Sequence, residues 1–334
     1  MGDGNLSYLK IDESISERDE TRREHTNGQR RTRRSRDHRP EAHHMHDIHD
    51  PNNATKPSFS REAFIGISAG AGILAGTGLS ASAAVLTLGN FHDPIVPEND
   101  PAISIVTPEL PRPGGAIRSY AAVPKAATQT THGVVVVQHI WGVDASIRDV
   151  VRRFAKAGYV TIAPSLFSRL NAPSGDRADD YRPFRDLAAK LDDEQVKGDI
   201  EAGATWIRKR AAVDARIRPP KVGLTGFCMG GAIALRIAAT SDAFDACAIW
   251  YGRVANEYAA TLKIPMLGSY GARDTSIPAE GVREFQTKLH VPNDIKIYPE
   301  AGHAFFDDQR QSYVPSAAPD SWSRTLAWFG KYLP

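Results

Sequence analysis

Cysteine is scarce in this chain of 334 residues, which contains it only at positions 228 and 247. Two cysteines exclude a disulfide framework as the basis of the fold. Cys247 lies in an apolar, strand-like stretch, so we expect it to be buried. Nothing in the chain indicates a metal site or a cofactor, and we expect neither.

Net charge is also small, at +2, but the charge is unevenly distributed. Residues 1–62 have almost no apolar periodicity and predict a disordered tail that is basic and His-rich. The run from Arg30 to Arg36 could bind nucleic acid or anionic lipid, but a solvated disordered tail is the favoured explanation. His-rich tracts can bind metal, but no carboxylate or cysteine frame organises the histidines between His43 and His49. We therefore expect no metal site and no specific nucleic acid here.

Residues 63–90 carry no charge and form a segment that is long enough to span a bilayer. The segment is rich in Gly, Ala and Ser, so it is only weakly hydrophobic. Ala81-Ser82-Ala83 offers a small-residue cleavage site. Upstream, the segment around Arg61 resembles a twin-arginine export signal in which Glu62 replaces the second arginine. We expect a signal-like or membrane-anchor segment, and hence an exported or membrane-anchored protein. The alternative is a Gly/Ala-rich linker or helix on a cytoplasmic protein.

The remainder divides into a Pro-rich linker over residues 91–113 and a folded domain over residues 114–334. Hydrophobic residues make up 41% of the chain and support a sizeable core. Strand-like and helix-like segments alternate through the domain, which predicts an α/β fold with a mostly parallel sheet and helices on both faces. The expected strands are 116–122, 133–138, 159–163, 222–225, 246–250, 264–270 and 294–298, and the expected helices are 145–157, 192–209, 320–332 and one after residue 228.

The most informative stretch is Lys221–Ala239, where a short buried strand, a Gly-rich turn and an apolar helix follow one another. A residue on such a tight turn has a strained backbone, and only small neighbours such as Gly226 and Gly230 fit beside it. The dipole of the following helix favours a thiolate over a thiol. The pattern therefore predicts a nucleophile elbow with Cys228 as nucleophile. A structural cysteine in a Gly-rich turn is the alternative.

Two further residues complete a catalytic triad in the order that α/β-hydrolases use, nucleophile, acid and histidine. Asp274 and His303 each lie in a loop just past the carboxyl end of an expected strand. That edge of an open α/β sheet is where sites are built. We therefore predict that Cys228, His303 and Asp274 form the triad.

From about residue 110 to the end, the chain resembles the dienelactone hydrolase family of α/β-hydrolases, whose enzymes are carboxymethylenebutenolidase-like. The matching stretches are 137–143, 226–231, 250–252, 271–274 and 302–305. The resemblance implies an α/β-hydrolase fold and a Cys-His-Asp triad, which matches the three residues above. It also implies an oxyanion hole built from the backbone N–H groups of Ile140 and Met229, aimed where negative charge develops.

The sequence departs from the family at two places that bear on the substrate. The family has a glutamate where this chain has His139, so we expect His139 to face Cys228 and tune its ionisation. Members that cleave dienelactone carry an arginine shortly after the catalytic histidine, whereas here none occurs before Arg310. Dienelactone itself is therefore not the expected substrate. Trp141, Arg253 and Phe305 complete the residues expected to bind or orient substrate, although Arg253 could equally be a solvent-exposed loop residue.

These residues together predict a carboxylic ester hydrolase that acts on a small-molecule ester or lactone without a cofactor. Cys228 would attack the carbonyl carbon, and water would hydrolyse the resulting acyl-thioester. Two alternatives stay open: a catalytically inactive hydrolase fold that acts as a binding module, and a nucleic-acid-associated protein that works through the Arg-rich tail. Residues 63–90 could also contact a membrane, and the sequence does not determine the oligomeric state.

Overall fold

The computed structural model describes residues 92–125, 132–211 and 220–334. The predicted tail over residues 1–62 and the apolar segment over residues 63–90 lie outside these ranges. Within them, none of the helices combines the length and the apolar character that crossing a membrane requires.

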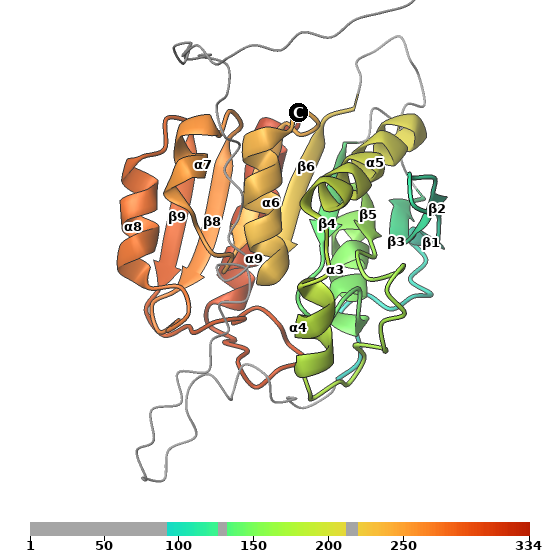
Figure 1. Ribbon diagram of the computed structural model, residues 1–334, viewed down its shortest axis with the longest axis horizontal. Helices are drawn as coiled ribbons and strands as arrows, with labels where there is room; N and C mark the ends of the chain where they lie inside the picture. The colour runs from blue at the N-terminus through green and yellow to red at the C-terminus, as the bar shows by residue number, and fades with distance from the viewer. Residues whose placement is uncertain (1–91, 126–131, 212–219) are drawn as a thin grey trace, which may run out of the picture. The chain divides into compact units, whose positions relative to one another are not determined.

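The central sheet is mostly parallel, with the strand order β1-β3-β5-β4-β6-β7-β8-β9, and β2 pairs with β3 beside this row (Figure 1). The parallel strands are β4 (Gly133–Val137), β5 (Val160–Pro164), β6 (Val222–Phe227), β7 (Ala246–Trp250), β8 (Met266–Gly271) and β9 (Asn293–Tyr298). The antiparallel strands are β1 (Ile103–Val106), β2 (Glu109–Leu110) and β3 (Ile117–Pro124). The predicted α/β fold with a mostly parallel sheet is thereby confirmed.

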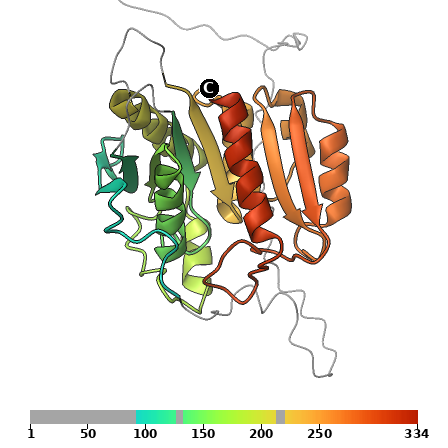
Figure 2. The ribbon, with the colours of Figure 1, turned by 180° about the vertical axis from the view of Figure 1, so that it is seen from behind.

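Helices cover both faces of the sheet, and each face has its own hydrophobic core. Figure 1 shows one face covered by α5 (Asp193–Ala211), α6 (Met229–Thr240), α7 (Asn256–Thr261) and α8 (Ala279–Thr287). Figure 2 shows the other face, covered by α3 (Ala145–Lys156) and α9 (Ala318–Tyr332). The short helix α4 (Arg182–Ala188) lies in the polar stretch that follows β5. Of these helices, α4, α7 and α8 were not expected from the sequence.

The valine run of β4 shows why the strands are apolar along their whole length. Val135 and Val137 belong to the core under α5 and α6, whereas Val134 and Val136 belong to the core under α3 and α9. Because successive side chains of a strand point to opposite faces, a strand covered on both faces must be apolar at every position. This requirement puts β4 in the middle of the sheet, next to β6.

The stretch over residues 91–113, predicted to be a Pro-rich linker, is in part strand. It contains β1 and β2, which extend the sheet by pairing antiparallel with β3. Proline was a misleading signal here because Pro101, Pro108 and Pro111 lie outside the two short strands and therefore remove no donor from their ladders.

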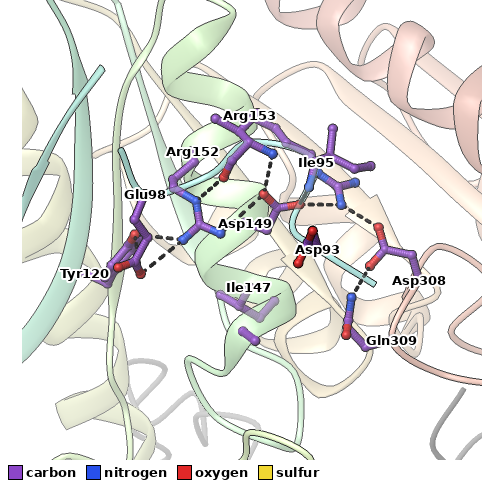
Figure 3. Close-up of polar contacts among 12 residues, drawn as sticks. Asp93, Ile95, Glu98, Tyr120, Ile147, Asp149, Arg152, Arg153, Asp308 and Gln309 are labelled. Atoms are coloured by element: carbon purple, nitrogen blue, oxygen red, sulfur yellow. Dashed lines mark hydrogen bonds and ion pairs between the residues drawn. The ribbon is translucent and has the colours of Figure 1, made fainter. Parts of the chain in front are cut away.

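The segment before β1 is held against α3 by buried charges (Figure 3). The carboxylate of Asp149 accepts hydrogen bonds from the backbone N–H groups of Ile95 (3.2 Å) and Val96 (2.9 Å). Arg152 donates to the carbonyl oxygen of Val96, and Arg153 donates to Asp149 at 2.7 Å. The sequence could not reveal these contacts because Asp149 lies more than fifty residues away from the segment that it binds.

Through its contact with Asp149, Arg153 also links this segment to the loop that follows β9. Its guanidinium forms an ion pair with Asp308 and lies over the ring of Phe306, 5.6 Å from the centroid. Asp149 and Arg153 together thus connect the segment before β1 to the loop that contains Asp308.

We expect Asp149→Ala to lower the free energy of unfolding by about 3–5 kcal/mol, because it removes the carboxylate that pairs with buried Arg152 and with Arg153, whose side chain is 10% exposed. The matched control is Asp242→Ala, whose carboxylate is 93% exposed and lies 3.7 Å from Lys263. That change should cost less than about 1 kcal/mol. Urea denaturation measures both, and equal losses would contradict the importance of the Asp149 contacts.

Candidate active site

Cys228 occupies a sharp turn between the end of β6 and the start of α6. Its backbone has φ 55° and ψ −119°, a conformation that residues other than glycine rarely adopt. The turn leaves no room at its flanks, because a Cβ atom at Gly226 would overlap the carbonyl oxygen of Gly230. A Cβ atom at Gly230 would in turn overlap the carbonyl oxygens of Val137 and Gln138. The structure therefore has the strained turn with small neighbours that the sequence predicted.

The structure brings Cys228, His303 and Asp274 together in one hydrogen-bonded chain. His303 Nε2 lies 3.0 Å from Cys228 Sγ, and His303 Nδ1 lies 2.7 Å from Asp274 Oδ2. Asp274 follows β8 and His303 follows β9, so all three residues lie at the carboxyl ends of parallel strands.

Ser276 supports the carboxylate of Asp274 and was missed by the sequence analysis. Asp274 Oδ1 accepts three hydrogen bonds: from the Ser276 N–H (2.9 Å), the Ser276 hydroxyl (2.7 Å) and the Ile277 N–H (3.0 Å). The Asp-x-Ser pattern typical of an Asx turn was the signal that could have found it. These bonds fix one carboxylate oxygen and leave the other for His303.

The electrostatics of these three hydrogen-bonded side chains favour an ion pair between the Cys228 thiolate and the His303 imidazolium. Burial disfavours both charges, but His303 outweighs it and lowers the pKa of the Cys228 thiol. The thiolate and Asp274 likewise overcome burial and raise the pKa of His303 to about 10. The pKa of Asp274 is lowered despite its burial, because His303 and Ser276 donate hydrogen bonds to the carboxylate. Cys247, by contrast, is fully buried as expected, and burial raises its pKa.

Ile140 and Met229, the expected oxyanion donors, belong to two segments that are in close contact. Met229 begins α6, and its N–H forms a hydrogen bond that helps to lower the pKa of Cys228. The start of α6 packs against the end of β4, where Gly230 lies close to the backbone of Val137, just before the loop that contains Ile140. In that loop the Gly142 N–H donates to the His139 carbonyl oxygen at 3.2 Å. The close approach at Gly230 is therefore what brings the two segments together.

The residues expected to bind substrate have different surroundings. Phe305 is completely buried between the rings of Tyr251 and Tyr298, at centroid distances of 5.5 Å and 5.2 Å. The prediction that Phe305 contacts substrate is therefore wrong, because the backbone after His303 turns this side chain into the core. Arg253 is exposed and donates to the carbonyl oxygen of Ser276 at 3.4 Å, so it lies beside the Asp274 turn.

Trp141 and His139 are both buried beside charged groups. The Trp141 ring lies 4.0 Å from the guanidinium carbon of Arg310 and packs edge-on against Phe184 at 5.4 Å. His139 lies between two carboxylates, those of Asp144 and Asp307.

Tyr251 is a second residue that the sequence analysis missed. It follows β7 with a φ of 36°, and its ring packs edge-on against the His303 ring at 5.3 Å. A positive φ on a tyrosine is costly and marks a position that its surroundings strongly determine. The Tyr251 ring therefore packs against the imidazole of His303 in a fixed position and helps to orient it.

Metal ligation finds no support in the described part of the chain, where no group of three or more His, Cys, Asp or Glu side chains is arranged to hold an ion. The chemistry available to this site is that of a nucleophile activated by a histidine.

A mostly parallel sheet with helices on both faces and a nucleophile elbow at the end of a central strand defines the α/β-hydrolase class. The family follows from a comparison with known proteins. The dienelactone hydrolase family model matches residues 117–333, which is more than half of the chain. The chain belongs to the dienelactone hydrolase family, and the prediction that it is a hydrolase of this family is confirmed.

Individual relatives agree with this assignment. A Salmonella typhimurium protein described as "putative carboxymethylenebutenolidase" is 38% identical over 247 residues, covering 70% of this chain and 89% of the relative. An Escherichia coli K12 protein of the same description is 37% identical over 252 residues, covering 71% and 91%. A crystal structure described as a "putative dienelactone hydrolase" from Klebsiella pneumoniae is 37% identical with a TM-score of 0.63, covering 69% of this chain and all of the other.

We expect the protein to show thiolate absorbance in the ultraviolet at neutral pH, because His303 lowers the pKa of Cys228. The absorbance should be lost as the pH falls through that lowered pKa. His303→Gln should strongly reduce it at neutral pH, because the largest effect that opposes burial is then lost, and only His139 and the Met229 N–H still lower the pKa of the thiol. Cys247→Ala is the control and should keep the signal, since burial raises the pKa of Cys247. Absorbance that persists in Cys228→Ala would contradict the assignment.

Proposed function

We propose that this protein hydrolyses small carboxylic esters or lactones through a Cys228-His303-Asp274 triad and an acyl-thioester intermediate. One observation carries the proposal: contacts of 3.0 Å and 2.7 Å join the three side chains, and the first of them is on a strained turn at a helix N-terminus. Such a constellation is recognised by geometry and roles rather than by sequence position. The assembled triad also weighs against an inactive hydrolase fold that serves only to bind a ligand.

The first half of the reaction forms the thioester. The Cys228 thiolate attacks the carbonyl carbon, and the carbonyl electron pair moves onto oxygen to give a tetrahedral oxyanion. When the oxyanion collapses, the C–O bond of the ester breaks. The leaving alkoxide takes the proton from Nε2 of His303, which becomes neutral. Asp274 holds the Nδ1–H throughout and keeps the ring in the required tautomer.

The second half returns the enzyme to its starting state. Neutral His303 takes a proton from water, and the resulting hydroxide attacks the thioester carbonyl carbon. Collapse of this second tetrahedral intermediate expels the Cys228 thiolate and releases the carboxylic acid. The site thus regains the ion pair that the pKa shifts of both side chains favour.

The backbone N–H groups of Ile140 and Met229 are the proposed oxyanion donors in both halves. The N–H of Met229 already stabilises negative charge on the adjacent sulfur, which lowers the pKa of the thiol. Donors of this kind stabilise charge in the transition state without having to reorganise.

The substrate class rests on the family and on the relatives named carboxymethylenebutenolidase. We propose an ester or lactone other than dienelactone itself, since no arginine occurs between His303 and Arg310. Arg253 is an exposed cation beside the Asp274 turn and the proposed contact for an anionic group of the substrate.

We expect Cys228→Ala to lower kcat/KM for every hydrolysed ester or lactone by roughly 10³-fold or more, because the nucleophile is lost. The measurement is a panel of aryl esters, alkyl esters and lactones assayed with the full chain. Cys247→Ala removes the other thiol from the core and should leave kcat/KM within a few-fold. If Cys228→Ala kept most of its activity, Cys228 would not be the nucleophile.

We also propose that residues 63–90 direct export or anchor the protein in a membrane, because they are free of charge and are followed by the folded domain. Cell fractionation should find the protein outside the cytoplasm or with the membrane. Glu62→Arg should increase export if the twin-arginine route is used. An uncleaved protein found wholly in the soluble cytoplasmic fraction would contradict the proposal.

A further inference from the structure

His139 has a carboxylate at each of its ring nitrogens. Its Nε2 lies 2.8 Å from Asp144 Oδ1, and its Nδ1 lies 3.5 Å from Asp307 Oδ2. All three side chains are at least 94% buried. Asp144 comes from the same loop as His139, whereas Asp307 comes from the loop after β9, so the contact joins two separate parts of the sheet edge.

With both carboxylates ionised, this arrangement suits only the doubly protonated ring. A neutral imidazole has one N–H and one bare nitrogen, whereas an ionised carboxylate only accepts hydrogen bonds. In the neutral form, one of the two carboxylates would therefore face a lone pair. With a proton on each nitrogen, both contacts become favourable.

The charges around His139 balance when it is an imidazolium. Arg310 lies 4.0 Å from Asp307, so two carboxylates and two cations form one buried group. Burial raises the pKa of Asp307, and the charge of Asp144 raises it further. The His139 cation outweighs burial and lowers the pKa of Asp144. Tyr251, whose pKa burial raises, stays neutral beside this group.

The same cation acts on Cys228. Burial alone would lower the pKa of His139, but Asp144 and Asp307 outweigh it and raise that pKa. The charge of His139 then lowers the pKa of the Cys228 thiol, as a second cation after His303.

We propose that two buried carboxylates, Asp144 and Asp307, hold His139 in its doubly protonated form as a fixed cation beside the thiol of the active site. The proposal rests on the proposed function, in which Cys228 is the nucleophile. His139 makes the thiolate available without transferring a proton, and the carboxylates act through it. They are therefore positioning residues, in contrast to His303, whose proton moves in every turnover.

Asp144 permits a variant that separates this role from a structural one. Its Oδ1 also caps α3 by accepting a hydrogen bond from the Ile147 N–H at 3.1 Å. Asparagine caps a helix as well as aspartate does, so Asp144→Asn keeps the cap and removes only the charge. Asp144→Ala removes both and serves as the matched comparison for stability.

The first test reads the protonation of His139 directly. Histidine ring ¹⁵N chemical shifts of the full chain are recorded between about pH 5 and about pH 9. The signals of His139 are assigned by their loss in His139→Gln. We expect both nitrogens to be protonated at neutral pH. Asp144→Asn should move the midpoint of the titration down by about one pH unit or more, a tenfold change in the protonation equilibrium.

The second test follows the charge at position 139. The rate of alkylation of Cys228 by iodoacetamide is measured against pH, with each cysteine resolved by peptide mass spectrometry. Below neutral pH we expect the unchanged protein to react fastest, His139→Gln about tenfold more slowly and His139→Glu more slowly still, because less of the thiol is ionised. An order that follows charge rather than side-chain size is not expected of a purely structural residue.

Two results would overturn the proposal: a neutral His139 with one bare nitrogen at neutral pH, or alkylation curves that superimpose for the three residues at position 139. The ¹⁵N measurement on the unchanged protein and Asp144→Asn decides the first point even if a position 139 variant fails to fold. Alkylation reports ionisation of the thiol whether or not the thiol performs catalysis. A wrong proposal about His139 is therefore distinguishable from a wrong proposed function. The hydrolysis assays with Cys228→Ala test only the proposed function.

Discussion

The left-handed backbone of Cys228 is the constraint from which the rest of the site follows. A strained residue of this kind costs on the order of 1–3 kcal/mol and persists only where its surroundings determine it. Here β6 is paired on both sides, by β4 and β7, and the Cys228 N–H donates to the Trp250 carbonyl oxygen at 3.0 Å. The sheet thus holds the turn, and the turn lifts the sulfur above the sheet edge at the start of α6.

Once the sulfur occupies this position, the parallel topology supplies its partners. The carboxyl ends of β4, β8 and β9 lie at the same edge of the sheet as the elbow, and the loops that follow them contribute His139, Asp274 and His303. Burial would keep the thiol neutral, but the charges of the two histidines reverse that preference and lower the pKa of Cys228. The reactivity of the sulfur is therefore a property of three loops rather than of the elbow alone.

The outer strands and the segment before them are also connected to this site. Arg153 on α3 contacts Asp149, which holds residues 95 and 96, and pairs with Asp308 in the loop after His303. The next residue along that loop, Asp307, faces His139. The buried charges near the start of the domain and those of the site are thus continuous, which ties the position of the His303 loop to the packing of α3.

Much of the fold was readable from the sequence because its signals are local. The valine run of β4, the apolar face of α3 and the small residues around Cys228 each reflect a requirement set within a few neighbouring residues. Boundaries predicted from these signals agree with the structure to within a few residues. The edge strands β1 and β2 and the helices α4, α7 and α8 were missed, since they are short and depend on pairing or packing with distant parts of the chain.

By itself, the sequence predicted most strands and helices of the domain and the three residues proposed as nucleophile, acid and histidine, because chain order and turn chemistry encode them. Only the tertiary structure decided that Phe305 packs into the core, that Ser276 supports Asp274, and that His139 lies between Asp144 and Asp307. Asp307 lies 168 positions after His139 in the chain, and no local pattern links them. Contacts of this kind arise only when parallel strands bring their loops to one edge, so the charge that surrounds the thiol is a property of the folded chain.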